Sequence, residues 1–115
     1  MNDTVALKKL ADRIRLLNDN LRTTFVGGRV VMTQGVADLP VDERARVLLK
    51  VRGFADFDAE NDPHGEHDFG SFELAGETYF FKVDYYSPDL QGGSEDPADP
   101  EKTTRVLTIM RADEY

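Results

Sequence analysis

The chain has 115 residues, a formal net charge of −8 at pH 7 and no cysteine. This length predicts one domain, residues 1–115, and the lack of cysteine excludes disulfides, thiolate metal sites and thiol nucleophiles. Charged residues interrupt the apolar runs, so we find no signal-peptide core and no membrane span and expect a soluble, cytoplasmic protein.

The charge is unevenly distributed along the chain. Residues 1–53 hold ten basic and six acidic residues, a sum of +4, whereas residues 54–115 hold four basic and sixteen acidic residues, a sum of −12. Because dense negative charge repels phosphate, we do not expect direct binding of nucleic acid. Three interpretations remain: a solvated surface that keeps the protein soluble, a cation site, or a surface that binds a basic partner protein.

The first predicted element is an amphipathic helix that ends near Arg22. Its apolar side chains recur every three or four residues, at Leu7, Leu10, Ile14, Leu17 and Leu21. Asp3 or Thr4 would cap its start. The stripe serves either the core of the domain, which we favour, or a partner helix.

A short strand over residues 30–33 and a second helix follow. The helix begins near residues 38–40, where proline suits the first turn, and Gly53 would adopt a left-handed conformation past its end. Its inner face would consist of Val41, Ala45, Leu48 and Val51.

Three more strands complete the chain. Residues 69–74 and 77–86 alternate in polarity on either side of Ala75-Gly76, which predicts a tight hairpin, and residues 105–111 form the last strand. Residues 54–63 and 86–102 are expected to be loops. The order α-β-α-β-β-β predicts an α+β fold, with two amphipathic helices on one face of a three- to four-stranded antiparallel sheet.

Both histidines lie within residues 61–70, and this clustering is the strongest chemical signal in the sequence. The hairpin register would place His67 opposite Asp84, whose carboxylate would raise the pKa of the imidazole. A divalent metal could be bound by His64, Glu66, His67 and Asp84, or His67 and Asp84 could form a catalytic acid–base pair. We favour a third interpretation, in which the side chains of this turn cap backbone groups and pair with acids. No cofactor is then expected, with a divalent metal as the alternative.

Four segments resemble signature segments of domain-of-unknown-function family 3768: TFVGGRVVMT, NDPHGEHDFGSF, FFKVDYY and GSEDPADPEKTTRVLTIM. The resemblance spans about residues 17–115. Members are small single-domain proteins, mainly from alphaproteobacteria and often plasmid-borne. The resemblance implies a bacterial cytoplasmic protein with an accessory role on mobile elements, and it implies no activity, cofactor or catalytic residue.

The sequence favours a non-enzymatic interaction module over an enzyme. Residues 56–68 and 89–101 would form one acidic face that steers a basic protein surface toward it. The alternative is a metal-binding or hydrolytic module centred on His64, Glu66 and His67, with Asp84.

Overall fold

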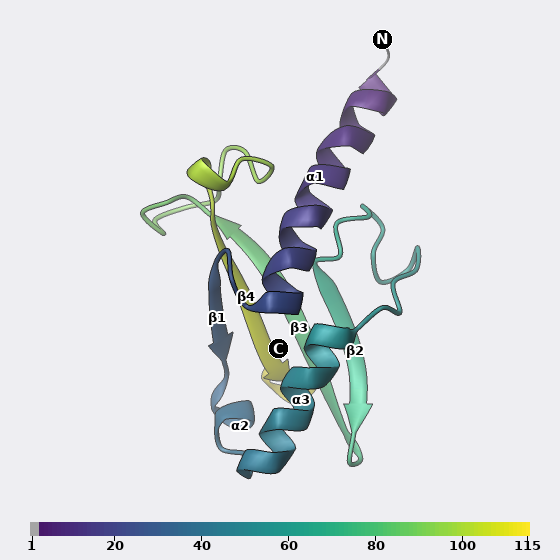
Figure 1. Cartoon of the computed structure of the whole chain (residues 1–115), viewed down its shortest axis with the longest axis vertical. Helices are drawn as coiled ribbons and strands as arrows, with labels where there is room; N and C mark the ends of the chain where they lie inside the picture. The colour runs from purple at the N-terminus through teal and green to yellow at the C-terminus, as the bar shows by residue number, and fades with distance from the viewer. Residues whose placement is uncertain (1–2) are drawn as a thin grey trace.

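The structure is a computed structural model that describes residues 3–115. Two helices pack on one face of a four-stranded sheet, which confirms the predicted α+β fold (Figure 1). The helices are α1 (Asp3–Thr24), α2 (Gln34–Ala37) and α3 (Val41–Gly53), the strands are β1 (Arg29–Met32), β2 (Phe69–Leu74), β3 (Glu77–Tyr86) and β4 (Thr104–Arg111), and the short 3-10 helices are η1 (Pro100–Lys102) and η2 (Ala112–Glu114). Within residues 3–115, no helix is long and apolar enough to cross a membrane.

The sheet has the order β1-β4-β3-β2 and is mixed. The antiparallel pairs are β2 with β3 and β3 with β4, whereas β1 runs parallel to β4. The prediction of an entirely antiparallel sheet is therefore wrong. The reason is that both β1 and β4 enter the sheet from the same end, β1 after α1 and β4 after the loop that follows β3 (Figure 1).

The β2–β3 hairpin forms in the predicted register. Ala75 and Gly76 have φ angles of 53° and 80°, as a two-residue turn of type I′ requires. Phe72 therefore pairs with Tyr79 and Ser71 with Phe80. The ladder continues to the carbonyl of Asp68, which accepts a 2.9 Å hydrogen bond from the amide of Val83.

The core lies between the sheet and the C-terminal half of α1, together with α3. Its fully buried members are Leu21, Val36, Val47, Val51, Tyr79, Phe81, Leu107 and Ile109. Only part of the apolar stripe of α1 is buried. Ile14 and Leu21 are buried, whereas Leu7 is 65% exposed and Leu10 is 41% exposed. The N-terminal half of α1 projects beyond the sheet (Figure 1). Asp3 and Thr4, the two predicted N-caps, both lie within α1, which begins at Asp3.

The second predicted helix corresponds to α3, but its inner face is rotated. Val47 and Val51 are buried, whereas Val41 is 73% exposed and Ala45 is exposed, so the predicted inner face is only partly correct. Gly53 is the last helical residue and has no positive φ angle. A left-handed glycine is not needed here, because the buried guanidinium of Arg22 caps the end of α3.

Glu114 joins the C-terminal segment to the start of α2. Its carboxylate accepts hydrogen bonds from the Thr33 hydroxyl at 2.7 Å and from the amides of Gly35 and Arg111, both at 2.9 Å. These bonds, with that of Thr33 as the largest contribution, hold the pKa of Glu114 below its ordinary value. A depressed pKa in the folded state stabilises the fold above the ordinary pKa, and this stabilisation is lost as the pH falls through the folded-state pKa.

Glu114→Gln is therefore expected to lower the free energy of unfolding at pH 7 by about 1 kcal/mol. The difference from wild type should shrink below about pH 4, where the wild-type carboxylate is protonated as well. Urea denaturation at pH 7 and at about pH 3.5 measures this. The control is Glu73→Gln, because Glu73 is exposed and no hydrogen bond or ion pair is seen for its side chain within residues 3–115. A difference that stays constant with pH would contradict the role of the charge.

Candidate functional site

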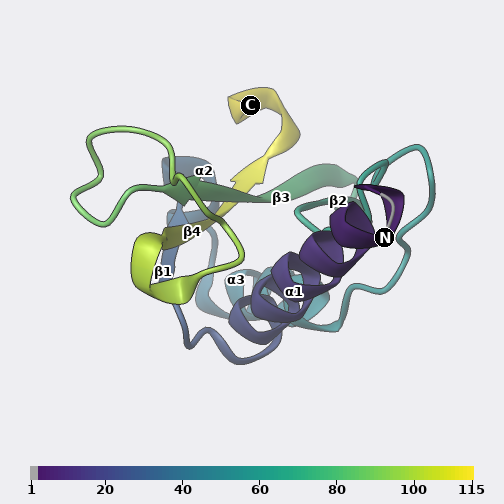
Figure 2. The same cartoon turned by 90° about the horizontal axis from the view of Figure 1, so that it is seen from above.

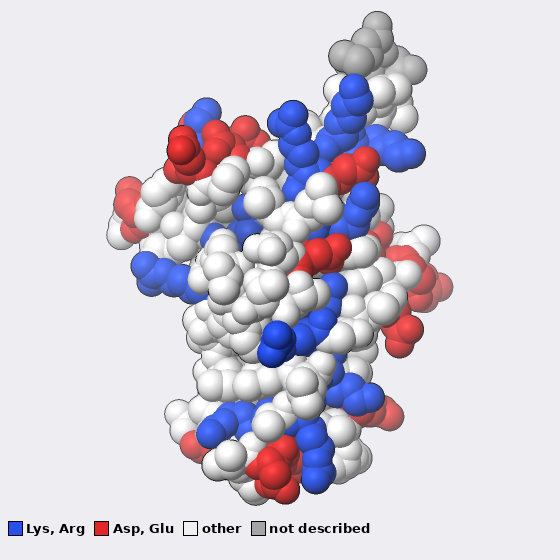
Figure 3. All heavy atoms as spheres, viewed as in Figure 1, with Lys and Arg blue, Asp and Glu red and all other residues white. Residues whose placement is uncertain are grey.

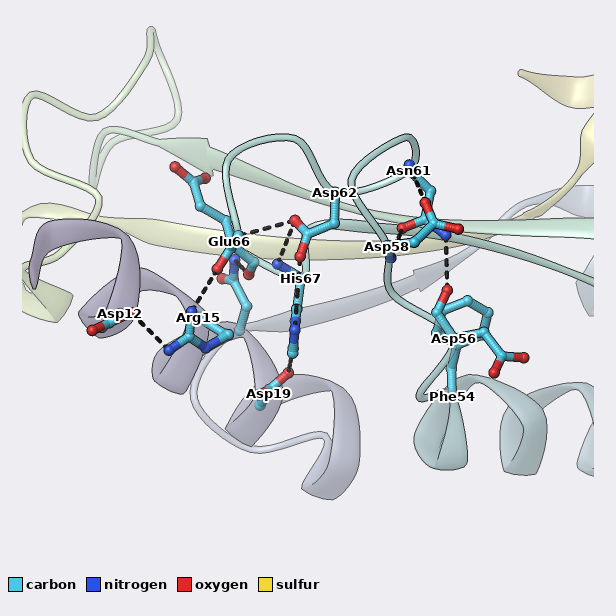
Figure 4. A network of polar contacts seen from close by, with 12 residues as sticks. Asp12, Arg15, Asp19, Phe54, Asp56, Asp58, Asn61, Asp62, Glu66 and His67 are labelled. Atoms are coloured by element: carbon cyan, nitrogen blue, oxygen red, sulfur yellow. Dashed lines mark hydrogen bonds and ion pairs between the residues drawn. The ribbon is translucent and has the colours of Figure 1, made fainter. Parts of the chain in front are cut away.

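The histidine turn, residues 58–67, is anchored to α1 through His67 (Figure 4). The Nδ1 atom of His67 lies 2.8 Å from Oδ1 of Asp19, and its Nε2 atom lies 3.7 Å from Oδ2 of Asp62. The ring also stacks on Phe57, with centroids 3.8 Å apart and planes 4° from parallel. Because carboxylates flank both ring nitrogens and an aromatic ring covers one face, His67 acts as a brace between the turn and the helix.

The backbone of the turn is shaped by Asp62. Its buried carboxylate accepts hydrogen bonds from the amides of Glu66 and His67 at 3.0 and 3.1 Å. Gly65 and His67 have φ angles of 67° and 55°, so the chain bends sharply between them. The carbonyl of Gly65 accepts a 3.0 Å bond from Arg15 on α1, which adds a second anchor (Figure 4).

Behind the turn, Asn18 of α1 connects three elements and is fully buried. Its Oδ1 atom accepts a 2.8 Å bond from Arg105 of β4, and its amide nitrogen donates to the carbonyl of Glu66 and the hydroxyl of Tyr85. The Tyr85 hydroxyl donates in turn to the carboxylate of Glu66 at 2.7 Å. Burial, followed by this bond to Glu66, raises the pKa of Tyr85 far above its ordinary value. Arg105 also donates to the carbonyl of Pro97, so the network extends to the loop between β3 and β4.

The four predicted site residues do not converge. His67 and Glu66 belong to the network described above, whereas Asp84 projects from the opposite face of the sheet and pairs with Lys82 at 2.8 Å. The predicted contact between His67 and Asp84 does not form, because the positive φ angle of His67 turns the chain away just beyond the last rung of the ladder. Within residues 3–115, no three His, Asp or Glu side chains are placed to hold a metal ion.

His64 is exposed and lies between two hollows. It lines a small hollow of about 310 Å³ together with Asp68, Lys82 and Asp84. Burial raises the pKa of Asp68, and the hydrogen bond from Lys82 to Asp84 raises the pKa of Lys82. Lys82 therefore stays protonated and neutralises Asp84.

On its other side, His64 borders a larger groove of about 720 Å³ between α1 and the turn. The α1 wall is mainly apolar and consists of Leu7, Leu10, Ala11 and Ile14, with Lys8, Asp12 and Arg15 beside them. The opposite wall comes from the turn and consists of Ala59, Asp62, Pro63, His64, Gly65 and Glu66. The polar network fixes the turn against α1 at Arg15, Asn18 and Asp19, and thereby holds the wall that the turn contributes.

The acidic residues do not form one face. The 54–68 loop and the 87–102 loop extend to opposite sides of the molecule in both orthogonal views (Figures 1 and 2). Figure 3 shows the corresponding acidic side chains gathered at two places, with basic side chains along α1 between them. The prediction of a single acidic face is therefore wrong. The reason is that one loop leads into the edge strand β2, whereas the other joins the central strands β3 and β4.

Much of this acidity serves to fold the loops. Asp58 accepts hydrogen bonds from the amides of Glu60 and Asn61, and Asp89, Asp96 and Asp99 each accept one from the amide two residues later. The bonds from Ser87 and from the amide of Gln91 also hold the pKa of Asp89 below its ordinary value. The bonds to each aspartate side chain from the amide two residues later form Asx turns, for which aspartate is well suited.

A family model described as a protein of unknown function, DUF3768, matches residues 32–114. The chain belongs to this family. The match runs from the end of β1 through α3, the histidine turn and all later strands, and α1 lies outside it. No curated protein and no solved structure matches the chain.

The residues that α1 contributes to the network are not among the predicted site residues. Asp19, Asn18 and Arg22 all lie within one helical turn, beside the apolar stripe. One signal was present, because Asn18 and Arg22 are spaced four residues apart next to Leu17 and Leu21, on the side that the core covers. Their partners in the turn and in β4 are distant in sequence, and no local pattern indicates them.

Proposed function

We propose that the protein is a non-enzymatic interaction module that binds a basic amphipathic helix of a partner protein in the groove between α1 and the turn. The observation that carries the proposal is that the apolar stripe of α1 is buried toward the C-terminal end of the helix and exposed toward its N-terminal end. Leu7 and Leu10 continue the row of apolar side chains that is buried further along the helix, yet they remain exposed beside a groove. Contiguous exposed apolar surface of this kind is typical of interaction sites, and a helix in a groove is a common way to cover it.

The charge of the turn favours a basic partner. Asp58 and Glu60 are exposed on either side of Ala59, which lines the groove, and no ion pair is seen for either within residues 3–115. On the α1 wall, Arg15 is already engaged by Asp12 at 2.7 Å and by the carbonyl of Gly65. We therefore expect the partner helix to carry its Lys or Arg residues on the flank that faces the turn, where electrostatic attraction would speed association.

Two model peptides test this proposal by isothermal titration calorimetry. Both have about 18 residues and the same amphipathic leucine pattern, with lysine at the polar positions of one and glutamate in the other. The lysine peptide is expected to bind at least about tenfold more tightly, and its affinity should fall steeply between about 50 and 300 mM salt. The double variant Leu7→Ser/Leu10→Ser should weaken its binding by about tenfold or more.

Matched controls separate this groove from non-specific attraction. Leu16→Ser alters a side chain of α1 that is 68% exposed but does not line the groove, and it should leave the affinity unchanged. Asp58→Asn/Glu60→Gln should weaken binding, whereas Glu95→Gln/Glu101→Gln in the other acidic loop should not. Equal binding of both peptides, or no effect of the leucine substitutions, would overturn the proposal. A dimeric free protein that Leu7→Ser/Leu10→Ser converts to a monomer would also overturn it, because a second copy would then occupy the groove.

A further inference from the structure

A second groove of about 490 Å³ runs between α3 and β2. Its apolar lining consists of Leu49, Phe54, Phe72 and Leu74, and the cationic side chains of Arg46 and Lys50 lie along its α3 side. All of its lining residues fall within the segment that matches the family model, unlike those of the α1 groove. It lies next to a strand whose outer edge is unpaired.

β2 is an edge strand, and its hydrogen-bonding pattern shows which backbone groups are free. Asp68 accepts the bond from Val83, and antiparallel strands exchange such bonds at every second residue. Gly70, Phe72 and Leu74 therefore bond to β3, so the amides and carbonyls of Phe69, Ser71 and Glu73 point away from the sheet. Within residues 3–115, no hydrogen bond is seen for these outward groups. The opposite edge, β1, is only four residues long.

We propose that this groove binds an extended acidic–apolar peptide, which pairs with β2 as an additional strand. Its backbone would bond to the outward amides and carbonyls of Phe69, Ser71 and Glu73, the mode known as β-augmentation. Alternate side chains of such a strand point to the face that carries α3, where Phe72 and Leu74 form the floor. This inference concerns a different surface and a different peptide conformation from the proposed function, and it stands independently of it.

The charge around the groove favours an acidic peptide over a basic one. No ion pair is seen for Lys50 in the described part of the chain. Arg46 pairs with Asp42 at the long distance of 3.8 Å, and both side chains are mostly exposed. Such an exposed pair is weak and leaves Arg46 able to bind an incoming carboxylate. Asp56 is the one carboxylate among the residues that line the groove. Glutamate or aspartate side chains of the peptide would therefore face Arg46 and Lys50.

The experiment uses three peptides of about eight residues that differ in one feature each. In the first, the positions that face α3 carry valine and glutamate in turn, and the other positions carry threonine. The second has lysine in place of glutamate, and the third is the first with its β2-facing amides methylated. Fluorescence anisotropy should show at least tenfold tighter binding of the glutamate peptide than of either other peptide. Amide hydrogen exchange at Phe69, Ser71 and Glu73 should be fast in the free protein and slow with the glutamate peptide bound.

Variants identify the surface. Arg46→Glu/Lys50→Glu should weaken the glutamate peptide by about tenfold or more, whereas Lys8→Glu/Lys9→Glu, two exposed cations on α1, should leave it unchanged. Leu7→Ser/Leu10→Ser should also leave it unchanged, which separates failure of this inference from failure of the proposed function. Equal binding of the methylated peptide, or no added protection of Ser71, would overturn strand addition. Equal binding of the lysine peptide would overturn the acidic specificity. Protection of these amides in a dimeric free protein would show that a second copy occupies the edge.

Discussion

Replacing Arg22 with methionine is expected to lower the free energy of unfolding by about 3 kcal/mol. The guanidinium is buried, and its Nη1 atom lies 3.0 Å from the carbonyl of Val51, 3.3 Å from that of Arg52 and 2.9 Å from that of Phe54. Its Nη2 atom bonds to Asp19 at 3.0 Å. Methionine has a similar length but no donor, so it would leave the C-terminal carbonyls of α3 and the Asp19 carboxylate without this partner.

Urea denaturation followed by circular dichroism measures this loss. Arg13→Met is the matched control, because Arg13 lies on the same helix, is exposed, and shows no ion pair within residues 3–115. It should change the free energy of unfolding by no more than about 0.5 kcal/mol. A loss below about 1 kcal/mol for Arg22→Met would contradict the role of Arg22 in joining α1 to α3.

Asn18→Leu is expected to cost about 4 kcal/mol, the largest effect of any single substitution in the polar network. Leucine has a similar volume, so the packing of the site would be largely kept, but Arg105 would lose the acceptor of its Nε atom in a buried position. The carbonyl of Glu66 and the hydroxyl of Tyr85 would lose a donor at the same time. A buried charge deprived of a partner is costly because it cannot recover the water that it lost on folding.

The same substitution should loosen the two segments that Asn18 and Arg105 connect. Hydrogen exchange is expected to accelerate in the turn over residues 62–67 and in the loop over residues 94–99. Asn20→Leu provides the control, because Asn20 is exposed and makes a single 3.2 Å bond to the carbonyl of Val26. If the two substitutions destabilise the protein equally, Asn18 does not hold the network together.

The sequence was most informative where structure depends on neighbouring residues. The turn at Ala75-Gly76, flanked by alternating polarity, is sufficient to predict the β2–β3 hairpin and its register, because both strands are adjacent in the chain. The parallel pairing of β1 with β4 joins the first strand to the last, and nothing in either strand indicates its partner. The inner face of α3 was mispredicted for the same reason, since it depends on where α1 and the sheet lie, and both are distant in sequence or set by distant residues.

In the candidate site, too, the local features could be predicted from the sequence and the distant partners could not. The clustering of His64 and His67 marked an ordered turn, in which Asp62 caps two backbone amides. The carboxylate that binds His67 was misassigned, because Asp19 comes from a helix far away in sequence and the positive φ angle of His67 turns the chain away from Asp84. Similarly, the periodicity of α1 predicted its apolar stripe, but only the extent of the sheet determines which half is left exposed.

Chemical-shift mapping tests the proposed function most directly. In ¹⁵N-labelled protein titrated with the lysine–leucine helical peptide, we expect the amide shifts to concentrate in residues 7–15 of α1 and 58–66 of the turn. Residues 89–101 should stay unchanged, although they carry comparable negative charge. Shifts concentrated in residues 89–101, or spread evenly over both acidic loops, would show that charge alone attracts the peptide and would contradict a specific groove.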